Sequence, residues 1–187
     1  VFVSEVVAEH DEQTHAGQVS IAGNGYRAGT ALWRTPAYID NLPTQASSPA
    51  VSLDNAGNAI AAWQQSDGSA LNAWASRADA GAGWQTPMQL GGVRSNVQKF
   101  QIDTDMAGNA LVVWQQNPTV LNNSTLMARR YLLATGWGNA SSVNMTGTDM
   151  ALDVNSSGKA LVVAKQKVSG GPTAGLQTAP WALLYQP

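Results

Sequence analysis

The side chains best suited to chemistry in this sequence are tryptophans and the polar residues near them. Seven tryptophans are present, and an indole ring can stack on a sugar while nearby amides hydrogen-bond its hydroxyls. Two glutamine pairs, Gln64-Gln65 and Gln115-Gln116, directly follow tryptophans. The sequence therefore predicts a ligand-binding set that could hold a glycan, and its members are Trp74, Gln65, Gln116, Arg77 and Arg130.

Packing is the competing explanation for most of these residues. A tryptophan is a large hydrophobe with one N–H to satisfy, and four of them recur at matching places in the chain: Trp63, Trp84, Trp114 and Trp137. Trp74 interrupts the pattern because Met127 stands at its matching place, so we expect Trp74 to be exposed. Arg77 and Arg130 also match each other, which suits a structural role.

No arrangement of residues predicts a catalytic centre. A glycosidase needs two facing carboxylates about 5–10 Å apart, and the acidic residues here lie mostly in turns or near the start of the chain. A Ser-His-Asp triad has only His10 and His15 to draw on, both in one short polar stretch. We therefore expect no catalytic residues and a protein that is not an enzyme.

Metal binding is also disfavoured. Asp103-Thr-Asp105 and the stretch 153–158 have the spacing that begins a calcium loop, but Trp114 and Ala164 stand where its bidentate Glu belongs. The acidic and imidazole side chains of residues 10–15 have no evident second shell to orient them on zinc. We expect no metal and no cofactor, and we interpret the acidic stretches as turns stabilised by Asp and Asn side chains.

These candidate residues lie on a repeated sequence. Asp54-Asn-Ala-Gly57-Asn58, followed by an apolar run and Trp63-Gln-Gln, returns with Gly108 and again, more diverged, with Gly158. The glycines are 51 and 50 residues apart, a period typical of stacked supersecondary units. Each Asp/Asn-x-x-Gly stretch predicts a tight turn between two strands. One domain of four units follows, with boundaries near 16–48, 49–97, 98–147 and 148–187.

The repeated strands are apolar at consecutive positions, as in Leu111-Val-Val113. Strand side chains alternate between two faces, so both faces of such a sheet must be covered. No amphipathic helix pattern is present to cover them, and neighbouring sheets must do so around an axis. The sequence predicts an all-β fold, a small β-propeller of about four antiparallel blades, or alternatively an open arc of a larger propeller.

The first residues are expected to close the ring. Val7 precedes Val19 by 12 residues, and Leu90 precedes Ile102 by the same number. This spacing indicates that the strand 1–7 corresponds to the fourth strand of a unit and stands before the first complete unit. We expect it to complete the last blade, since pairing the two chain ends removes open sheet edges.

One segment carries a resemblance to a known family. Asp79-Ala-Gly81-Ala-Gly-Trp84 is similar to the Asp-x-Gly-x-x-Trp part of the Asp box of sialidase-like propellers, with the Ser displaced to Ser76. The stretch 49–90 also resembles repeats of secreted bacterial propeller proteins. In the third unit Leu132 and Ala134 replace the Asp and Gly.

The resemblance implies a propeller fold, and it raises sialidase chemistry. Sialidases hold the substrate carboxylate with three arginines and use a Tyr nucleophile with an acidic partner. The arginines and tyrosines here show no spacing that brings three arginines to one point. The Asp box is itself a turn of the scaffold. A degenerate hydrolase is therefore the last of the functional hypotheses.

Composition narrows the class of partner. Only 12% of residues are charged, about half of the roughly 25% usual for soluble domains, and the formal charge is −2. That charge offers no basic face for nucleic acid, and no apolar run approaches a membrane span. Cysteine is absent, which excludes disulfides.

Two functional hypotheses lead. The first is a secreted or cell-surface, lectin-like binding module with a glycan or protein partner. The second is a structural subunit of a larger surface assembly or filament, so an oligomer is possible.

Overall fold

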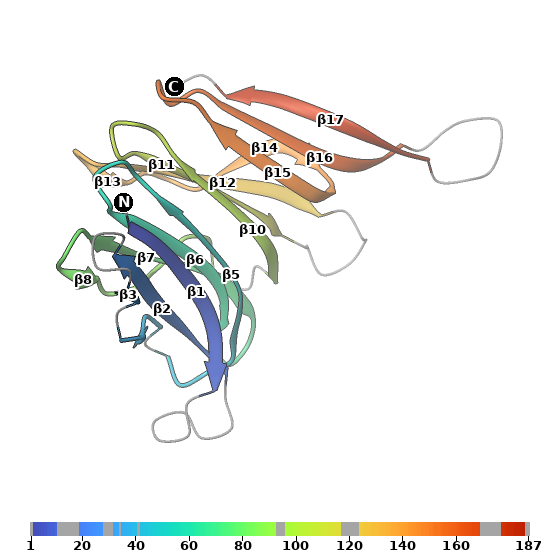
Figure 1. The fold of residues 1–187 in the computed structure, drawn as a ribbon. Helices are drawn as coiled ribbons and strands as arrows, with labels where there is room; N and C mark the ends of the chain where they lie inside the picture. The colour runs from blue at the N-terminus through green and yellow to red at the C-terminus, as the bar shows by residue number, and fades with distance from the viewer. Residues whose placement is uncertain are drawn as a thin grey trace.

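The computed structural model describes residues 2–10, 19–27, 32–33, 35–40, 42–92, 96–116, 124–168 and 177–185. All secondary structure in these residues is β-strand, which confirms the all-β prediction, and the strands pair antiparallel (Figure 1). None of these residues belongs to a helix that could cross a bilayer.

The strands form four separate sheets that follow one another along the chain. The first sheet contains β1 (Phe2–His10), β2 (Val19–Arg27), β3 (Leu32–Trp33) and β4 (Ala37–Tyr38). The second contains β5 (Ala46–Leu53), β6 (Ala59–Ser66), β7 (Leu71–Asp79), β8 (Gly83–Trp84) and β9 (Met88–Gln89). The third contains β10 (Val97–Thr104), β11 (Ala110–Gln116), β12 (Thr125–Leu132), β13 (Gly136–Trp137) and β14 (Ser141–Thr146). The fourth contains β15 (Thr148–Val154), β16 (Ala160–Val168) and β17 (Gln177–Tyr185).

The second and third sheets share one plan. Three long strands form a meander, and two short strands both pair with the third long strand, β8 and β9 with β7, and β13 and β14 with β12. The second sheet spans residues 46–89, the third 97–146 and the fourth 148–185, where the sequence predicts units at 49–97, 98–147 and 148–187.

The predicted tight turns join the first two strands of the second, third and fourth sheets. Gly57, Gly108 and Gly158 have φ of 85°, 80° and 80°, a left-handed conformation that glycine adopts without steric cost. In each turn the glycine N–H donates to the backbone oxygen of the residue three earlier, Asp54, Asp105 or Asn155. The turn prediction is confirmed in all three units.

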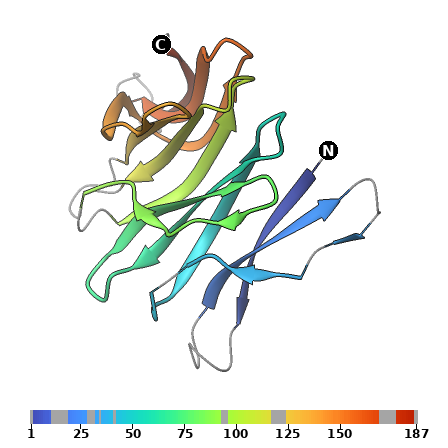
Figure 2. The same ribbon diagram turned by 90° about the vertical axis from the view of Figure 1, so that its left-hand side faces the viewer.

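The four sheets pack face to face in a row, and an apolar cluster fills each of the three interfaces. The first cluster joins the first and second sheets and includes Ile21, Ile39 and Trp63. The second joins the second and third sheets around Phe100 and Trp114. The third joins the third and fourth sheets, and includes Leu111, Val113, Met145, Met150 and Val162. Figures 1 and 2 show the first and fourth sheets at opposite ends of this row.

The expected role of the strand 1–7 is wrong. β1 pairs with β2 over nine residue pairs, from Phe2↔Arg27 to His10↔Val19, and belongs to the first sheet rather than the last. A repeat missed in the sequence explains the error. Trp33-Arg-Thr-Pro36 matches Trp84-Gln-Thr-Pro87 at a spacing of 51 residues. β3 and β4 pair with β2 as β8 and β9 pair with β7, so β1 and β2 are the counterparts of β6 and β7.

Gly23 lies inside strand β2. A Cβ added at Gly23 would lie 2.5 Å from Nε1 of Trp84 in the second sheet. The glycine is needed for the close approach of this indole ring to the backbone of β2, not for a chain reversal.

Substituting Gly23 tests this contact between the first two sheets. We expect Gly23→Ala to displace Trp84 and to lower the free energy of unfolding by about 1–3 kcal/mol, as overpacking does elsewhere. Chemical denaturation followed by tryptophan fluorescence measures the change. Gly92→Ala is the matched control, because no atom lies within 4 Å of a Cβ added there. Equal stability of the two variants would contradict the packing assigned to Trp84.

Candidate functional site

Gln65, one of the predicted ligand-binding residues, is a buried structural residue. Its side chain is 0% exposed, and its Oε1 accepts a hydrogen bond from Nε1 of Trp63 at 3.1 Å. Its Nε2 donates to Oδ2 of Asp40 and to the backbone oxygens of Leu42 and Thr44, at 3.0–3.3 Å. These bonds hold the connection between the first and second sheets against β6. None of its hydrogen-bonding capacity faces solvent.

Gln116 does not repeat this arrangement. It occupies the position of Gln65 in the third unit, yet it is half-buried, and its side chain makes no hydrogen bond to the described residues. The neighbouring Gln115 is the buried one, and its Nε2 donates to Oγ of Ser124 at 2.5 Å. The indole N–H of Trp114 has no acceptor among the described residues. The Gln-Gln pair therefore has different hydrogen-bond partners in the second and third sheets.

Trp74 is not the exposed aromatic residue that its sequence position suggested. It is half-buried, and its Nε1 is fully buried without an acceptor among the described residues. It lies opposite Trp63 and Gln89 in the second sheet and packs against the cluster shared with the first sheet. The reason is positional: it lies on the face of β7 that the first sheet covers.

The two predicted arginines have separate surroundings. Arg77 is 7% exposed, forms an ion pair with Asp79, and stacks over the ring of Tyr131 at 5.5 Å. This contact joins the second sheet to the third. Arg130 lies one strand position away from Tyr131 but lines a cavity on the other side of the third sheet. The structure thus does not bring the five predicted residues to one site.

The acidic turns satisfy their own carboxylates. Oδ1 of Asp105 accepts from the backbone N–H groups of Ala107 and Asn109, and Oδ2 accepts from Nδ2 of Asn109, all at 2.8–2.9 Å. Asp54 makes the same three bonds in the second unit. These oxygens stabilise the turn, as the sequence predicts from its Asp and Asn residues. No group of three potential metal-binding side chains occurs in the part of the chain that the structure describes. Residues 11–15 lie outside it.

Two cavities lie between sheets. One, of about 150 Å³, lies between the first and second sheets and is lined by Asn24, Asp79 and Trp84 among others. The other, of about 280 Å³, lies between the third and fourth sheets, and its polar lining includes Arg130, Ser142 and Asn144. Sequence reasoning treated Asp79 and Trp84 as scaffold and overlooked Asn24. The Asp79–Trp84 segment was the signal that could have pointed to the first cavity.

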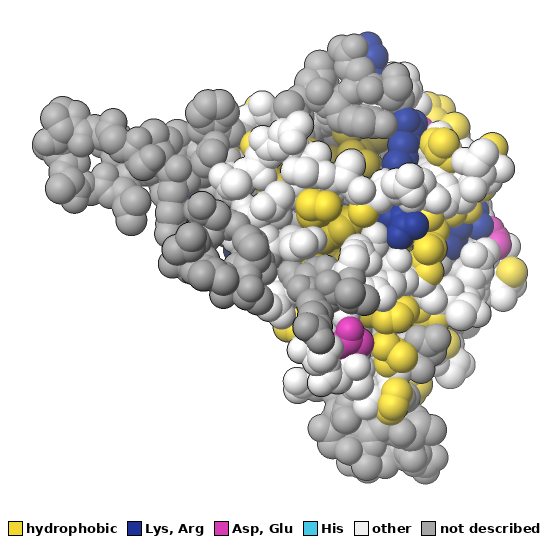
Figure 3. Space-filling view, turned by 180° about the vertical axis from the view of Figure 1, so that it is seen from behind, with side chains coloured by type: hydrophobic (Ala, Val, Ile, Leu, Met, Phe, Trp, Pro, Cys, Tyr) yellow, Lys and Arg dark blue, Asp and Glu magenta, His cyan; other side chains and the backbone are white. Residues whose placement is uncertain are grey.

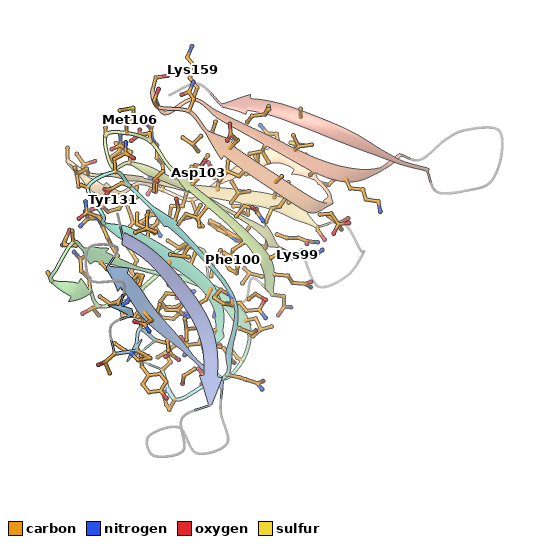
Figure 4. All side chains as sticks on the ribbon, viewed as in Figure 1. Lys99, Phe100, Asp103, Met106, Tyr131 and Lys159 are labelled. Atoms are coloured by element: carbon orange, nitrogen blue, oxygen red, sulfur yellow. The ribbon has the colours of Figure 1, made fainter. Side chains whose placement is uncertain are left out.

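Several polar side chains connect one sheet to the next. Nη1 of Arg129 donates to the backbone oxygens of Gln89 and Leu90, both at 2.9 Å, and its Nε donates to that of Gly138. Partial burial lowers the pKa of Arg129 from its usual value. Asp103 accepts from the N–H of Val154 at 2.7 Å, and Figure 4 shows it on β10 beside the fourth sheet. Arg129 and Asp103 thus form hydrogen bonds that join neighbouring sheets.

The surface is poor in charge, as the composition suggests. In the view from behind, hydrophobic patches lie among uncharged polar atoms, and charged side chains are few (Figure 3). At the edge of the third and fourth sheets, Nζ of Lys99 donates to Asp149 at 2.6 Å and lowers the pKa of that carboxyl group.

Comparison with known proteins gives no family. No family model matches the chain, and no curated protein matches it.

Gln65 offers the sharpest test of the structural role assigned to a predicted ligand residue. We expect Gln65→Leu to lower the free energy of unfolding by about 2–4 kcal/mol, since the buried Trp63 Nε1 loses its acceptor and Oδ2 of Asp40 loses the Gln65 donor. Urea denaturation provides the measurement. Gln116→Leu, the same change at the matching position, should cost less than about 1 kcal/mol because no hydrogen bond to the described residues is lost. A similar decrease in the free energy of unfolding in both variants would contradict the structural role assigned to the Gln65 side chain.

Proposed function

We propose that the chain is an open arc of propeller-type blades that works as a non-enzymatic interaction module, a structural subunit of a larger assembly. Meander sheets packed face to face in sequence order support the propeller comparison. In this proposal the four sheets are blades, and β5, β10 and β15 are their first strands. β5 and β10 lie against each other, as do β10 and β15.

The observation that carries the proposal is the exposed apolar face of the fourth sheet. There Leu161 is 41% exposed, whereas the second and third sheets bury Ile60 and Leu111 at the same position. An exposed, apolar sheet face is a surface that proteins cover by association.

A hydrolase is less well supported by the same side chains. A carboxylate clamp would need arginines that converge, but Arg77 pairs with Asp79, and Arg129 donates to three backbone oxygens. Arg130 lines a different space, between the third and fourth sheets. A secreted or cell-surface location remains a prediction from the sequence.

Sedimentation velocity of the purified chain tests the proposal. We expect the mass to rise above that of the 19.6 kDa monomer as the concentration increases from about 1 µM to about 200 µM, without any added ligand. A chain that remains monomeric over this range would contradict an assembly-forming role.

The cavity between the first and second sheets supports a second candidate function, glycan binding. Trp84 and Asp79 both line it, and Oδ1 of Asn24 is buried without a partner among the described residues. A stacking ring with polar neighbours is the usual means of holding a sugar.

A glycan array tests this candidate. We expect binding that Asn24→Ala reduces at least about tenfold, because Asn24 would supply a hydrogen bond to the ligand. Gln64→Ala is the control, since Gln64 lies outside the cavity and bonds to Ser47. Binding that is absent, or equally affected by both changes, would reject the cavity as a glycan site.

A further inference from the structure

The outward side of the fourth sheet is a mixed apolar and charged surface, which we name the end face. It contains the outward-pointing residues of the three strands, namely Ala151, Asp153, Leu161, Val163, Lys165 and Ala182. Val163 pairs with Ala151 on one side and with Ala182 on the other, so the centre of the end face is a row of small apolar side chains. Ala151, Asp153, Leu161, Lys165 and Ala182 are exposed, and Val163 is half-buried.

The corresponding face of the third sheet is covered by a neighbouring sheet. Leu111 and Val113 occupy in β11 the positions that Leu161 and Val163 occupy in β16. Leu111 is 7% exposed and Val113 is 0% exposed, because the fourth sheet covers them. In the second sheet, Ile60 and Ala62 at the same positions are also buried. The end face therefore continues a series of sheet-to-sheet interfaces and is its one uncovered member among the described sheets.

A polar contact also joins the third and fourth sheets, and its acceptor has a counterpart on the end face. Asp103 on the third sheet accepts the backbone N–H of Val154 on the fourth. Asp153 is its counterpart on the end face, and its carboxylate is exposed without a hydrogen bond to the described residues. A surface that covers the end face would need to offer Asp153 a donor or a positive charge.

Lys165 can provide that charge from a second copy. Asp153 and Lys165 lie on opposite sides of the Val163 row along the strands, since Asp153 pairs with Leu161 and Lys165 pairs with Thr148. A two-fold axis that lies midway between two facing sheets, parallel to them and perpendicular to the strands at Val163, reverses one copy along the strand direction. Asp153 of each copy then lies near Lys165 of the other, and the apolar rows face each other. Lys165 is half-exposed, and its nearest carboxylate, Asp149, is 4.0 Å away.

We propose that the end face is the surface of a two-fold dimer, in which the fourth sheets of two copies pack face to face. This inference rests on the proposed assembly function and names the surface and the partner. Aligned packing of two sheets is a common arrangement in β proteins, and two-fold dimers are the commonest oligomers. The interface is isologous, so both copies contribute the same residues.

The absence of cysteine allows a direct test in the full chain. In Val163→Cys the two thiols face each other across the two-fold axis, and because facing sheets lie about 10 Å apart, we expect a short bis-maleimide linker to join most of the protein as a covalent dimer within the associated species. Leu133→Cys is the control, because Leu133 is a 50% exposed leucine in a turn of the third sheet. It should cross-link only at the slow rate of random collision. Equal cross-linking of the two variants would overturn the two-fold arrangement.

Charge and apolar substitutions separate the remaining outcomes. We expect Leu161→Asp to weaken self-association at least about tenfold, whereas Leu133→Asp leaves it unchanged. Asp153→Lys should weaken it too, and Asp153→Lys combined with Lys165→Asp should restore it, because the two-fold axis pairs the reversed charges again. Circular dichroism checks that each variant keeps the fold.

The results distinguish this inference from the proposed function. If the wild-type chain associates and Leu161→Asp associates equally well, another surface makes the contact; the end-face inference fails and the assembly function stands. If Leu161→Asp abolishes association but Val163→Cys does not cross-link, the end face meets a different part of the second copy, and the two-fold dimer is wrong. If the wild-type chain stays monomeric, both the function and the inference fail.

Discussion

Two-sided burial of the middle sheets is the constraint on which the rest of this structure depends. In β11, Val112 and Trp114 pack toward the second sheet, while Leu111 and Val113 pack toward the fourth. Burial of each such side chain contributes about 1.5–3 kcal/mol, so a lone sheet of this composition would expose several such side chains on either face. The strand is stable only between two neighbours. A row of sheets is the direct result of placing apolar residues at consecutive strand positions.

The polar residues complete this arrangement by connecting sheets and closing turns. Asp54 and Asp105 each accept three hydrogen bonds from their own turn, and Gln65 makes four bonds at a buried site. Arg129 reaches three backbone oxygens, two of them in the neighbouring sheet. With few charged residues in the chain, buried polar atoms must be matched locally, since an unmatched one costs about 1–3 kcal/mol. This explains why Gln65, one of the predicted ligand contacts, is bonded to partners within the fold.

The sequence predicted the local features and missed those that depend on packing. The turns at Gly57, Gly108 and Gly158 follow from Asp, Asn and Gly chemistry within five residues, and they are confirmed. The pairing of β1 was wrong because a 12-residue spacing was preferred over the stronger match of Trp33 with Trp84. Gln65 and Gln116 could not be told apart, because the difference lies in Asp40, Leu42 and Thr44, which approach only in the folded chain. Trp74 was misjudged for a similar reason.

The exposed end face of the fourth sheet needs features that make its contacts specific. A purely apolar end face would associate with any exposed sheet, including unfolded chains, and would favour aggregation. Asp153 and Lys165 disfavour such partners, because a partner without matching charges leaves both groups desolvated and unpaired. A head-to-tail contact at this face would leave a binding surface exposed on each copy, and further copies would add to form a ring or filament. A two-fold contact buries the same face of both copies and leaves none exposed. The proposed two-fold packing would cover the end face with residues that the fourth sheet already presents.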